Sequence, residues 1–266
     1  MIDFYQGHTS TCSGKVRLVL EEKGIEYNEI TIDLFSGEQK TPEYLKLNPN
    51  AVVPTIIHEG EVLTESTLIA EYLDEVFDGP QLRPSDPLAL ARMRRWPKII
   101  DEETHPGTLG VTYTVVVRNI MAQKKSDEEL EASFVAMPDQ VKAAKLRAMQ
   151  FEGVESEPFK LGVCAVENSF RRFEAGLAES GGPWFMGEDY TLADSGVTPW
   201  LMRFENIGFQ GMWDDKPNLA AWWERIKARP NFVGVVSRSI DPKSLNARAK
   251  FGAEIWPRAK QILSGE

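Results

Sequence analysis

The sequence has few of the residues from which proteins build disulfide frameworks or metal centres. Its 266 residues include only 2 cysteines and 3 histidines. Cys12 and Cys164 lie far apart in the chain, and they form neither a C-x-x-C pair nor a ligand cluster with His8, His58 and His105. We therefore expect neither a disulfide scaffold nor a metal site, and a single reactive thiol stays open.

The sequence also lacks an excess of positive charge and a long apolar run. Lys and Arg total 30 against 40 Asp and Glu, so the net charge of -10 disfavours a polyanionic partner such as nucleic acid. No segment has the roughly 18 to 20 apolar residues of a membrane helix, and no basic leader precedes an apolar run. We therefore expect a folded cytoplasmic protein with neither a membrane nor a nucleic-acid partner.

The first eighty residues alternate between strand and helix patterns. Short apolar or alternating runs predict strands, whereas apolar residues three and four apart predict helices. The predicted strands cover residues 2–5, 27–32, 55–58 and 62–63, and the predicted helices cover residues 13–23, the segment from 41, and 68–77. The resulting order, β-α-β-α-β-β-α, predicts a small α/β domain.

A linker composition follows this α/β pattern. Residues 78–87 contain one glycine and three prolines but few side chains that pack, which is typical of a domain boundary. Every later pattern is helical. We therefore predict two domains, an α/β domain at residues 1–79 and an all-α helical bundle at residues 86–266.

The helical part carries several local signals. Residues 163–177 hold an apolar stripe at helical spacing, and Cys164 is expected to lie in the core with it. Pro97 is expected to kink its helix because it lacks an N–H donor. Residues 123–157 are highly charged, which predicts a solvated helix pair or an insertion.

Two pairs of residues predict helix starts in this part. Ser126 with Glu129 and Thr191 with Asp194 have the spacing at which a hydroxyl and a carboxylate cap each other's backbone N–H groups. Both pairs are folding signals and carry no active-site chemistry.

Two serines mark the start of the first predicted helix. The unpaired N–H groups and partial positive charge at a helix start stabilise a thiolate. Ser10 and Ser13 stand in an S-x-x-S spacing there, and a hydroxyl donates a hydrogen bond to a thiolate. Serine is also a common N-cap, so an ordinary capping role stays open for both residues. Cys12, between them, is either a reactive thiol or a small buried residue.

Two further segments suit a peptide-like ligand. Val53-Pro54 stands at the entry to a predicted strand. A cis peptide bond there would let the backbone pair with an extended peptide. Alternatively, Pro54 is an ordinary proline of an edge strand. Glu65 and Ser66 precede the third helix and suit the ammonium and carboxylate of an amino acid, although an ordinary helix cap explains them too. Glutathione combines an amino-acid end, an extended middle and a thiol.

These residues carry a resemblance to a known family. Val53-Pro54-Thr55, Glu65-Ser66 and the segment Gly187-Glu188-Asp189-Tyr190-Thr191-Leu192-Ala193-Asp194 resemble hallmarks of the cytosolic glutathione transferase superfamily. The resemblance covers essentially the whole chain. It implies a thioredoxin-like glutathione-binding domain at residues 1–79, a helical substrate-binding domain at residues 86–266, glutathione as co-substrate and a homodimer.

The resemblance also assigns candidate site residues. The catalytic candidates are Ser10, Cys12 and Ser13, and the candidates for binding glutathione are Val53, Pro54, Glu65 and Ser66. In the implied reaction the glutathione thiolate attacks an electrophilic, aromatic substrate. Ser10 is the first candidate to donate a hydrogen bond to that thiolate.

The motifs resemble more than one class within the superfamily. Ser10-Thr11-Cys12-Ser13 is similar to the motif of zeta-class enzymes and of bacterial tetrachlorohydroquinone dehalogenases. Chain length and residues 82–87 and 92–96 resemble bacterial β-etherases, which implies cleavage of a β-aryl ether. Those etherases have asparagine where this chain has Cys12, and many relatives have glutamine where it has Val52. Reductive dehalogenation, cis-trans isomerisation and a non-catalytic binding role are the alternatives.

Overall fold

The protein is described here from a computed structural model of residues 1–237 and 242–265. It divides into two compact units that interleave along the chain. The first unit comprises Met1–Pro97, Leu177–Leu201 and the segment from Ala221 through α12 (Pro230–Ser237). The second comprises Lys98–Gly176, Met202–Ala220 and α13 (Pro242–Ser264). The single boundary expected near residue 80 stays a prediction.

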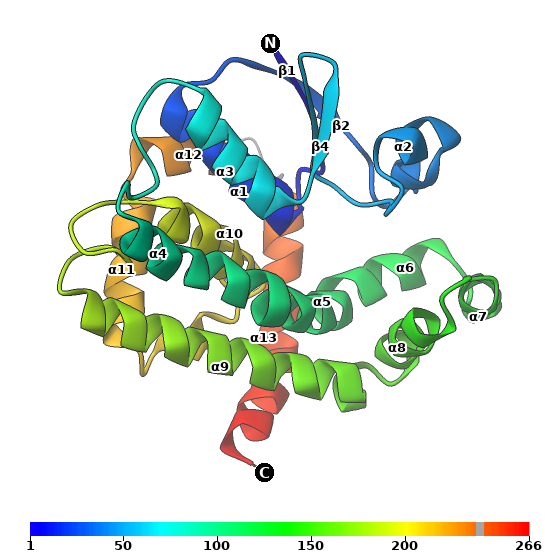
Figure 1. Cartoon of the computed structure of the whole chain (residues 1–266). Coiled ribbons are helices and arrows are strands. Elements are labelled where there is room, and N and C mark those ends of the chain that lie inside the picture. The colour runs from blue at the N-terminus through cyan, green and yellow to red at the C-terminus, as the bar shows by residue number, and fades with distance from the viewer. Residues whose placement is uncertain (238–241, 266) are drawn as a thin grey trace. The chain divides into compact units, whose positions relative to one another are not determined.

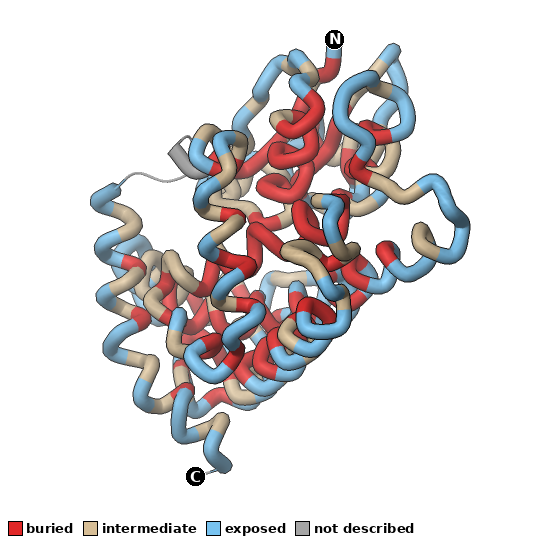
Figure 2. The backbone as a smooth tube through the Cα atoms, turned by 90° about the vertical axis from the view of Figure 1, so that its left-hand side faces the viewer, coloured by how far each residue is buried: buried red, intermediate tan, exposed pale blue. Residues whose placement is uncertain are grey.

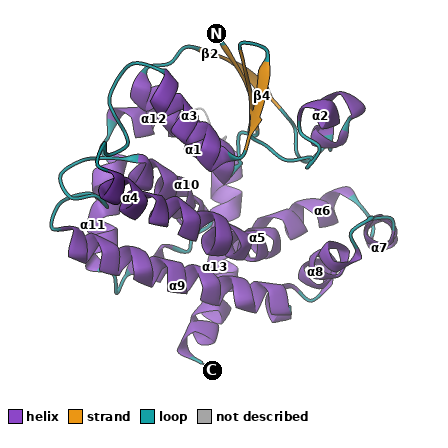
Figure 3. Cartoon of the chain, viewed as in Figure 1, coloured by secondary structure: helices purple, strands orange, loops and turns teal. Residues whose placement is uncertain are grey.

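A four-stranded mixed sheet lies in the first unit (Figure 3). Its strand order is β2-β1-β3-β4, in which β1 pairs parallel with β2 and antiparallel with β3, and β3 pairs antiparallel with β4. The strands are β1 (Ile2–Gln6), β2 (Tyr27–Thr31), β3 (Thr55–His58) and β4 (Glu61–Thr64). Each lies where the sequence predicts it, and the predicted α/β class is confirmed.

The helices of the N-terminal part also match the sequence patterns (Figure 1). They are α1 (Thr11–Lys23), α2 (Pro42–Leu47), α3 (Ser66–Val76) and α4 (Pro87–Ile99). Gly24 ends α1 in the left-handed conformation, with φ 65°, as a helix stop requires. The first unit also contains most of α10 (Leu192–Asn206) and α11 (Pro217–Lys227).

Helix α1 is buried over almost its whole length although it carries charged side chains (Figure 2). It packs against α3 and α12. An unpaired charge is costly in such a place, so each of these side chains needs a partner. The pairs are Lys15 with Thr67 at 2.7 Å, Arg17 with Gln6 and Glu29, Glu22 with Arg229 at 2.6 Å, and Lys23 with Asp74 at 3.1 Å.

The second unit is built from helices, as the sequence predicts. Two π-helical turns, η2 (Ile100–Thr104) and η3 (Tyr113–Val117), flank α5 (His105–Thr112), and α6 (Arg118–Lys124) follows. Helix α4 gives way to η2 shortly after Pro97, whose missing N–H interrupts the helical ladder. Among the described residues, no helix is both long and apolar enough to cross a membrane.

The charged segment 123–157 forms the predicted helix pair. Helices α7 (Asp127–Val135) and α8 (Gln140–Phe151) pack on each other around a small apolar cluster of Leu130, Phe134 and Ala143. Ser126 and Glu129 form the predicted capping box at the start of α7.

The prediction that Cys164 lies in the core is wrong. The stripe beside it on α9 (Glu157–Ser180) is buried, with Val163 and Val166 both fully covered, but Cys164 is exposed. Successive residues of a helix differ by about 100° in direction, so the residue after Val163 points away from the face that Val163 and Val166 share.

Asp194 holds the start of α10 in place. Its carboxylate is fully buried and accepts hydrogen bonds from the Thr191 N–H at 3.0 Å, the Phe185 N–H at 3.2 Å and the Trp222 indole at 2.9 Å. The predicted reach back to Thr191 is confirmed. Burial raises the pKa of Asp194 to about 6, although these donors act in the opposite direction.

This pKa predicts a pH-dependent stability. In the unfolded chain the Asp194 pKa is near 3.8, so between pH 4 and 6 the folded protein binds a proton that the unfolded chain has released. The contribution of Asp194 to stability therefore falls as pH rises through this window, by about 3 kcal/mol. Urea unfolding of the wild type and of Asp194→Asn, each at pH 4.5 and 6.5, measures this contribution to the free energy of unfolding. The wild type should lose stability relative to the variant at the higher pH, and an unchanged difference would contradict the assignment.

Candidate functional site

The three segments that carry the candidate site residues, around Ser10, Val53-Pro54 and Glu65-Ser66, lie at one edge of the sheet. Tyr5 on β1 pairs with Thr55 on β3, and Thr55 pairs with Thr64 on β4. Because β3 runs antiparallel to both neighbours, this rung brings together the end of β1, the start of β3 and the end of β4. The candidate catalytic and glutathione-binding residues belong to the chain segments that leave or enter these three strand ends.

Ser10 is the N-cap of α1. Its hydroxyl oxygen accepts a hydrogen bond from the Ser13 N–H at 3.2 Å, and its own N–H donates to the Gly7 carbonyl at 2.9 Å. The side chain is half-buried. Capping uses the oxygen as an acceptor, so the hydroxyl proton can still be donated to a thiolate. The capping and thiolate-binding interpretations of Ser10 are therefore compatible.

The other two catalytic candidates differ in their access to solvent. Ser13 is fully buried, and its hydroxyl accepts a hydrogen bond from the Gly7 N–H at 3.2 Å, which ties the end of the β1–α1 loop to the helix. Cys12 is half-buried, between the two alternatives that the sequence left open. Ser10 and Cys12 are thus the reachable side chains in the first turn of α1.

The Val53-Pro54 peptide bond is cis, as the sequence suggested. The preceding carbonyl, that of Val52, accepts hydrogen bonds from the Tyr44 hydroxyl at 2.7 Å and the Asn48 amide at 2.9 Å. The β3 ladder begins only at Thr55, so the backbone N–H and C=O of Val53 lie outside it. This geometry suits pairing with an extended peptide.

Sequence reasoning missed the roles of Tyr44 and Asn48. Both side chains are buried, and both also contact the Thr55 hydroxyl, at 3.0 and 3.2 Å. Burial raises the pKa of the Tyr44 phenol, which therefore stays protonated and able to donate. A buried Asn beside a proline-containing turn was the available signal, since buried amides need partners.

Glu65 and Ser66 form the start of α3. Glu65 is exposed and has φ 69°, a region that non-glycine residues enter rarely. Its side chain does not cap the helix, which leaves the first N–H groups of α3 for another acceptor. Ser66 is buried.

Lys15 adds a positive charge between the two helix starts, and the sequence did not single it out. Its ammonium donates to the Thr67 hydroxyl in the first turn of α3 at 2.7 Å and lies 5.3 Å from the centre of the Trp200 ring. Two helix N-termini and a buried lysine give this edge of the sheet a positive potential, which suits an anionic thiolate and a carboxylate. No three metal-ligating side chains converge within residues 1–237 and 242–265.

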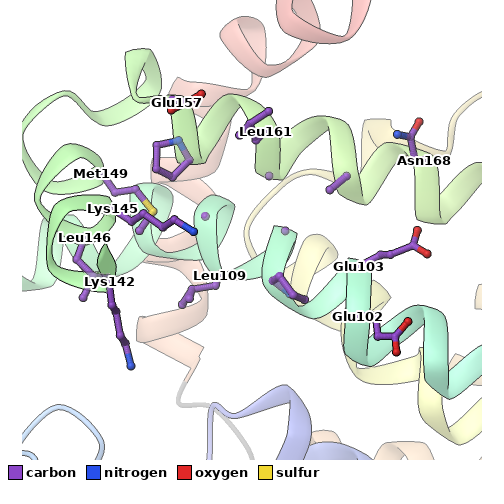
Figure 4. Close-up of a pocket in the computed structure, with 16 residues that line it drawn as sticks. Glu102, Glu103, Leu109, Lys142, Lys145, Leu146, Met149, Glu157, Leu161 and Asn168 are labelled. Atoms are coloured by element: carbon purple, nitrogen blue, oxygen red, sulfur yellow. The ribbon is translucent and has the colours of Figure 1, made fainter. Parts of the chain in front are cut away.

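A cavity of about 550 Å³ lies in the second unit (Figure 4). Residues of η2, α5, α8 and α9 line it, and the Lys145 side chain points into it (Figure 4). Glu103, at its rim, is paired with Arg172 at 2.5 Å. None of the candidate glutathione-site residues lines this cavity.

Comparison with known proteins matches both parts of the chain to one family. The sequence model of the glutathione S-transferase N-terminal domain matches residues 9–76, and that of the C-terminal domain matches residues 163–225.

Individual relatives match over most of their length. Protein LigF from Sphingobium sp. (strain NBRC 103272 / SYK-6) is 36% identical over 235 residues, which cover 83% of this chain and 87% of that protein. The tetrachloro-p-hydroquinone reductive dehalogenase of Sphingobium chlorophenolicum is 27% identical over 87% of this chain and 94% of its own length. The crystal structure of the β-etherase LigF superposes with a TM-score of 0.78 at 31% identity, covering 90% of this chain and 99% of that one.

These matches confirm the fold class and the co-substrate inferred from the sequence. The chain belongs to the glutathione S-transferase family and is an enzyme that uses glutathione.

Proposed function

We propose that this enzyme cleaves an aryl ether with glutathione. The thiolate attacks the carbon that bears the aryloxide, the C–O bond breaks, and a glutathione thioether and a phenol are formed. The observation that carries this proposal is the similarity to the β-etherase LigF, which extends over 90% of this chain and nearly all of that structure. The reaction needs a reactive thiolate and a bound glutathione, and the first unit has groups suited to both.

Ser10 is the residue we assign to thiolate activation. A free thiol has a pKa of about 8.5, and lowering it by two units, about 2.7 kcal/mol of differential stabilisation, makes most of it nucleophilic at neutral pH. The N-terminus of α1 and the Ser10 hydroxyl proton together supply stabilisation of this kind. Ser13 is the weaker candidate because its side chain is fully buried.

The glutathione backbone would bind along the same edge of the sheet. The Val53 N–H and C=O pair with the extended peptide, the N–H groups at Ser66 bind its α-carboxylate, and Glu65 binds its ammonium. The exposure of Glu65 and the uncapped start of α3 support this assignment.

The similarity to this family also supports proposals for the substrate class, the oligomeric state and the cellular location. We propose that the substrate is an aromatic electrophile, that the enzyme is a homodimer and that it works in the cytoplasm. The similarity to a β-etherase supports the aromatic substrate. The resemblance to cytosolic glutathione transferases supports the dimer and the location.

Reductive dehalogenation is the second candidate, and Cys12 favours it. Its thiol is half-buried in the first turn of α1, where the helix N-terminus favours a thiolate. Glutathione would first displace a halide from the ring. The Cys12 thiolate would then attack the sulfur of that adduct, forming a Cys12–glutathione disulfide while the ring carbon gains a proton, and a second glutathione would reduce the disulfide.

Four substrates separate these candidates. A β-aryl ether, a chlorinated hydroquinone, maleylacetoacetate and a chloronitroaromatic are incubated with enzyme and glutathione, and products are identified by mass spectrometry. We expect a phenol and a glutathione thioether from the ether, at the same rate in Cys12→Ala. Turnover confined to the chlorinated hydroquinone, with a trapped Cys12 disulfide, would instead establish dehalogenation. No turnover and no retention on glutathione-agarose would point to a non-catalytic protein.

Ser10 variants test thiolate activation separately from capping. Ser10→Gly keeps most of the capping energy but removes the hydroxyl, whereas Ser10→Thr keeps both. We expect the pKa of bound glutathione, followed by its ultraviolet thiolate absorbance, to rise by about one unit in Ser10→Gly and to stay near wild type in Ser10→Thr. Ser126→Ala is the control, because it removes an exposed helix cap elsewhere. Equal pKa values in the Gly and Thr variants would refute the role of the hydroxyl.

Asn48 variants test the support of the Val53 backbone. Asn48→Ala removes the 2.9 Å hydrogen bond to the Val52 carbonyl, so the strand-entry loop loses one of its two anchors. We expect the Kd of glutathione to rise about five- to tenfold, measured by isothermal titration calorimetry. Asn28→Ala is the matched control, because the exposed Asn28 side chain donates one hydrogen bond, to the Asp3 carboxylate at 3.0 Å, on another strand pair. A similar Kd in both variants would show that the loop needs no such anchor.

A further inference from the structure

A tight turn at residues 7–10 carries the chain from β1 into α1. The Ser10 N–H closes the turn by donating to the Gly7 carbonyl at 2.9 Å, and the Gly7 N–H donates to the Ser13 hydroxyl at 3.2 Å. These two bonds hold the ends of the turn. The side chain of His8, in the middle of the turn, reaches back to strands β1 and β2. One imidazole therefore ties the turn that positions Ser10 to the sheet.

The Gln6 side chain, at the end of β1, has one possible orientation of its amide. Gln6 is fully buried, and its Oε1 atom accepts a hydrogen bond from the guanidinium of Arg17, which is buried too. A guanidinium carries donors and no acceptor, so the amide oxygen must face Arg17 and the amide nitrogen must face the other way. That nitrogen donates to the Thr31 hydroxyl at 3.2 Å and lies 3.2 Å from Nδ1 of His8. A buried charge on α1 thus sets the direction in which Gln6 donates.

The orientation of Gln6 also fixes the tautomer of His8. The Gln6 amide nitrogen is a donor, so the His8 Nδ1 atom that faces it must accept and cannot carry a hydrogen. The ring hydrogen therefore lies on Nε2, 3.2 Å from the Thr31 hydroxyl oxygen, to which it donates. Every contact in this polar cluster of Arg17, Gln6, His8 and Thr31 then joins a donor to an acceptor. A hydrogen on Nδ1 would meet the amide hydrogens and break the contact with Gln6.

We propose that His8 is a positioning residue for the glutathione thiolate and acts through Ser10. Arg17 lies on α1, Gln6 on β1 and His8 in the turn before α1, so the hydrogen bonds run from the body of the helix back to its own start. The polar cluster braces the turn against the helix that Ser10 caps and keeps the Ser10 hydroxyl directed at the thiolate. Hydrogen bonds weaken steeply when they are misaligned, so a small rotation of the turn reduces thiolate stabilisation. The inference rests on the proposed role of Ser10.

Two substitutions of His8 test its hydrogen bond to Gln6. His8→Ala removes the imidazole, whereas His8→Asn keeps an amide oxygen near the Nδ1 position and still accepts from Gln6. We expect the pKa of bound glutathione, followed by its ultraviolet thiolate absorbance well below the Tm, to rise by about half a unit in His8→Ala and by less in His8→Asn. His58→Ala is the matched control, because it removes a histidine at the far end of β3, bonded to the Tyr72 hydroxyl at 2.8 Å. A lower Tm with an unchanged pKa in His8→Ala would show a purely structural role and overturn the proposal.

A double-mutant cycle separates positioning from a direct effect of the imidazole on glutathione. Thr31→Val keeps the shape of an exposed side chain on β2 but removes the hydroxyl that accepts from both Gln6 and His8. We expect Thr31→Val to raise the pKa of bound glutathione in the wild-type background and to add nothing in His8→Ala, because the cluster is already broken there. Additive increases, or no effect of Thr31→Val in either background, would refute the cluster.

Ser10→Gly, measured alongside, distinguishes failure of this inference from failure of the proposed function. A higher pKa of bound glutathione in Ser10→Gly but not in His8→Ala would refute the role of His8 alone. An unchanged pKa in both variants would refute both roles. A rise in His8→Ala without one in Ser10→Gly would show that His8 does not act through Ser10, and it would also overturn the proposal.

Discussion

Helix α1 takes charged side chains into the interior of the first unit, and the position of the candidate active site depends on how those charges are paired. Removing an ion from water costs several kcal/mol, so an α1 with free lysines and glutamates would not stay buried. Lys15 bonds to Thr67 at the start of α3, Lys23 to Asp74 near its end, and Glu22 to Arg229. The first two pairs fix α1 relative to α3, and they thereby place Ser10 and Ser66 in one framework.

The start of α1 shows how one side chain serves folding and chemistry together. Ser10 accepts a hydrogen bond from the helix backbone through its oxygen, which leaves its proton for a second partner. The sequence presented these roles as competitors, but they use different parts of the same hydroxyl. The arrangement joins the stability of α1 to the electrostatics of its N-terminus, because both depend on the cap being formed.

The two units differ in whether their buried charged side chains have partners. In the first unit, the buried charges of α1 have partners within the protein, and Asp194 has four backbone and side-chain donors around it. In the second unit, Lys216 is held by Glu167 at 2.9 Å, but Arg248 has no such partner among the described residues. A partner offsets much of the cost of burying a charge, whereas a buried charge without one keeps that cost.

The sequence by itself determined the order of strands and helices, the capped starts of α1, α7 and α10, and the segments that carry the candidate site. These depend on short-range signals, namely apolar periodicity, capping residues and proline, which act within a few residues. Cys164 was misplaced because its neighbour Val163 was buried, whereas its own direction on α9 decided its exposure. Only the tertiary structure decided that Tyr44 and Asn48 hold the Val52 carbonyl and that Lys15 reaches α3. Each of these depends on the register of strands and the crossing of helices, which no local pattern specifies.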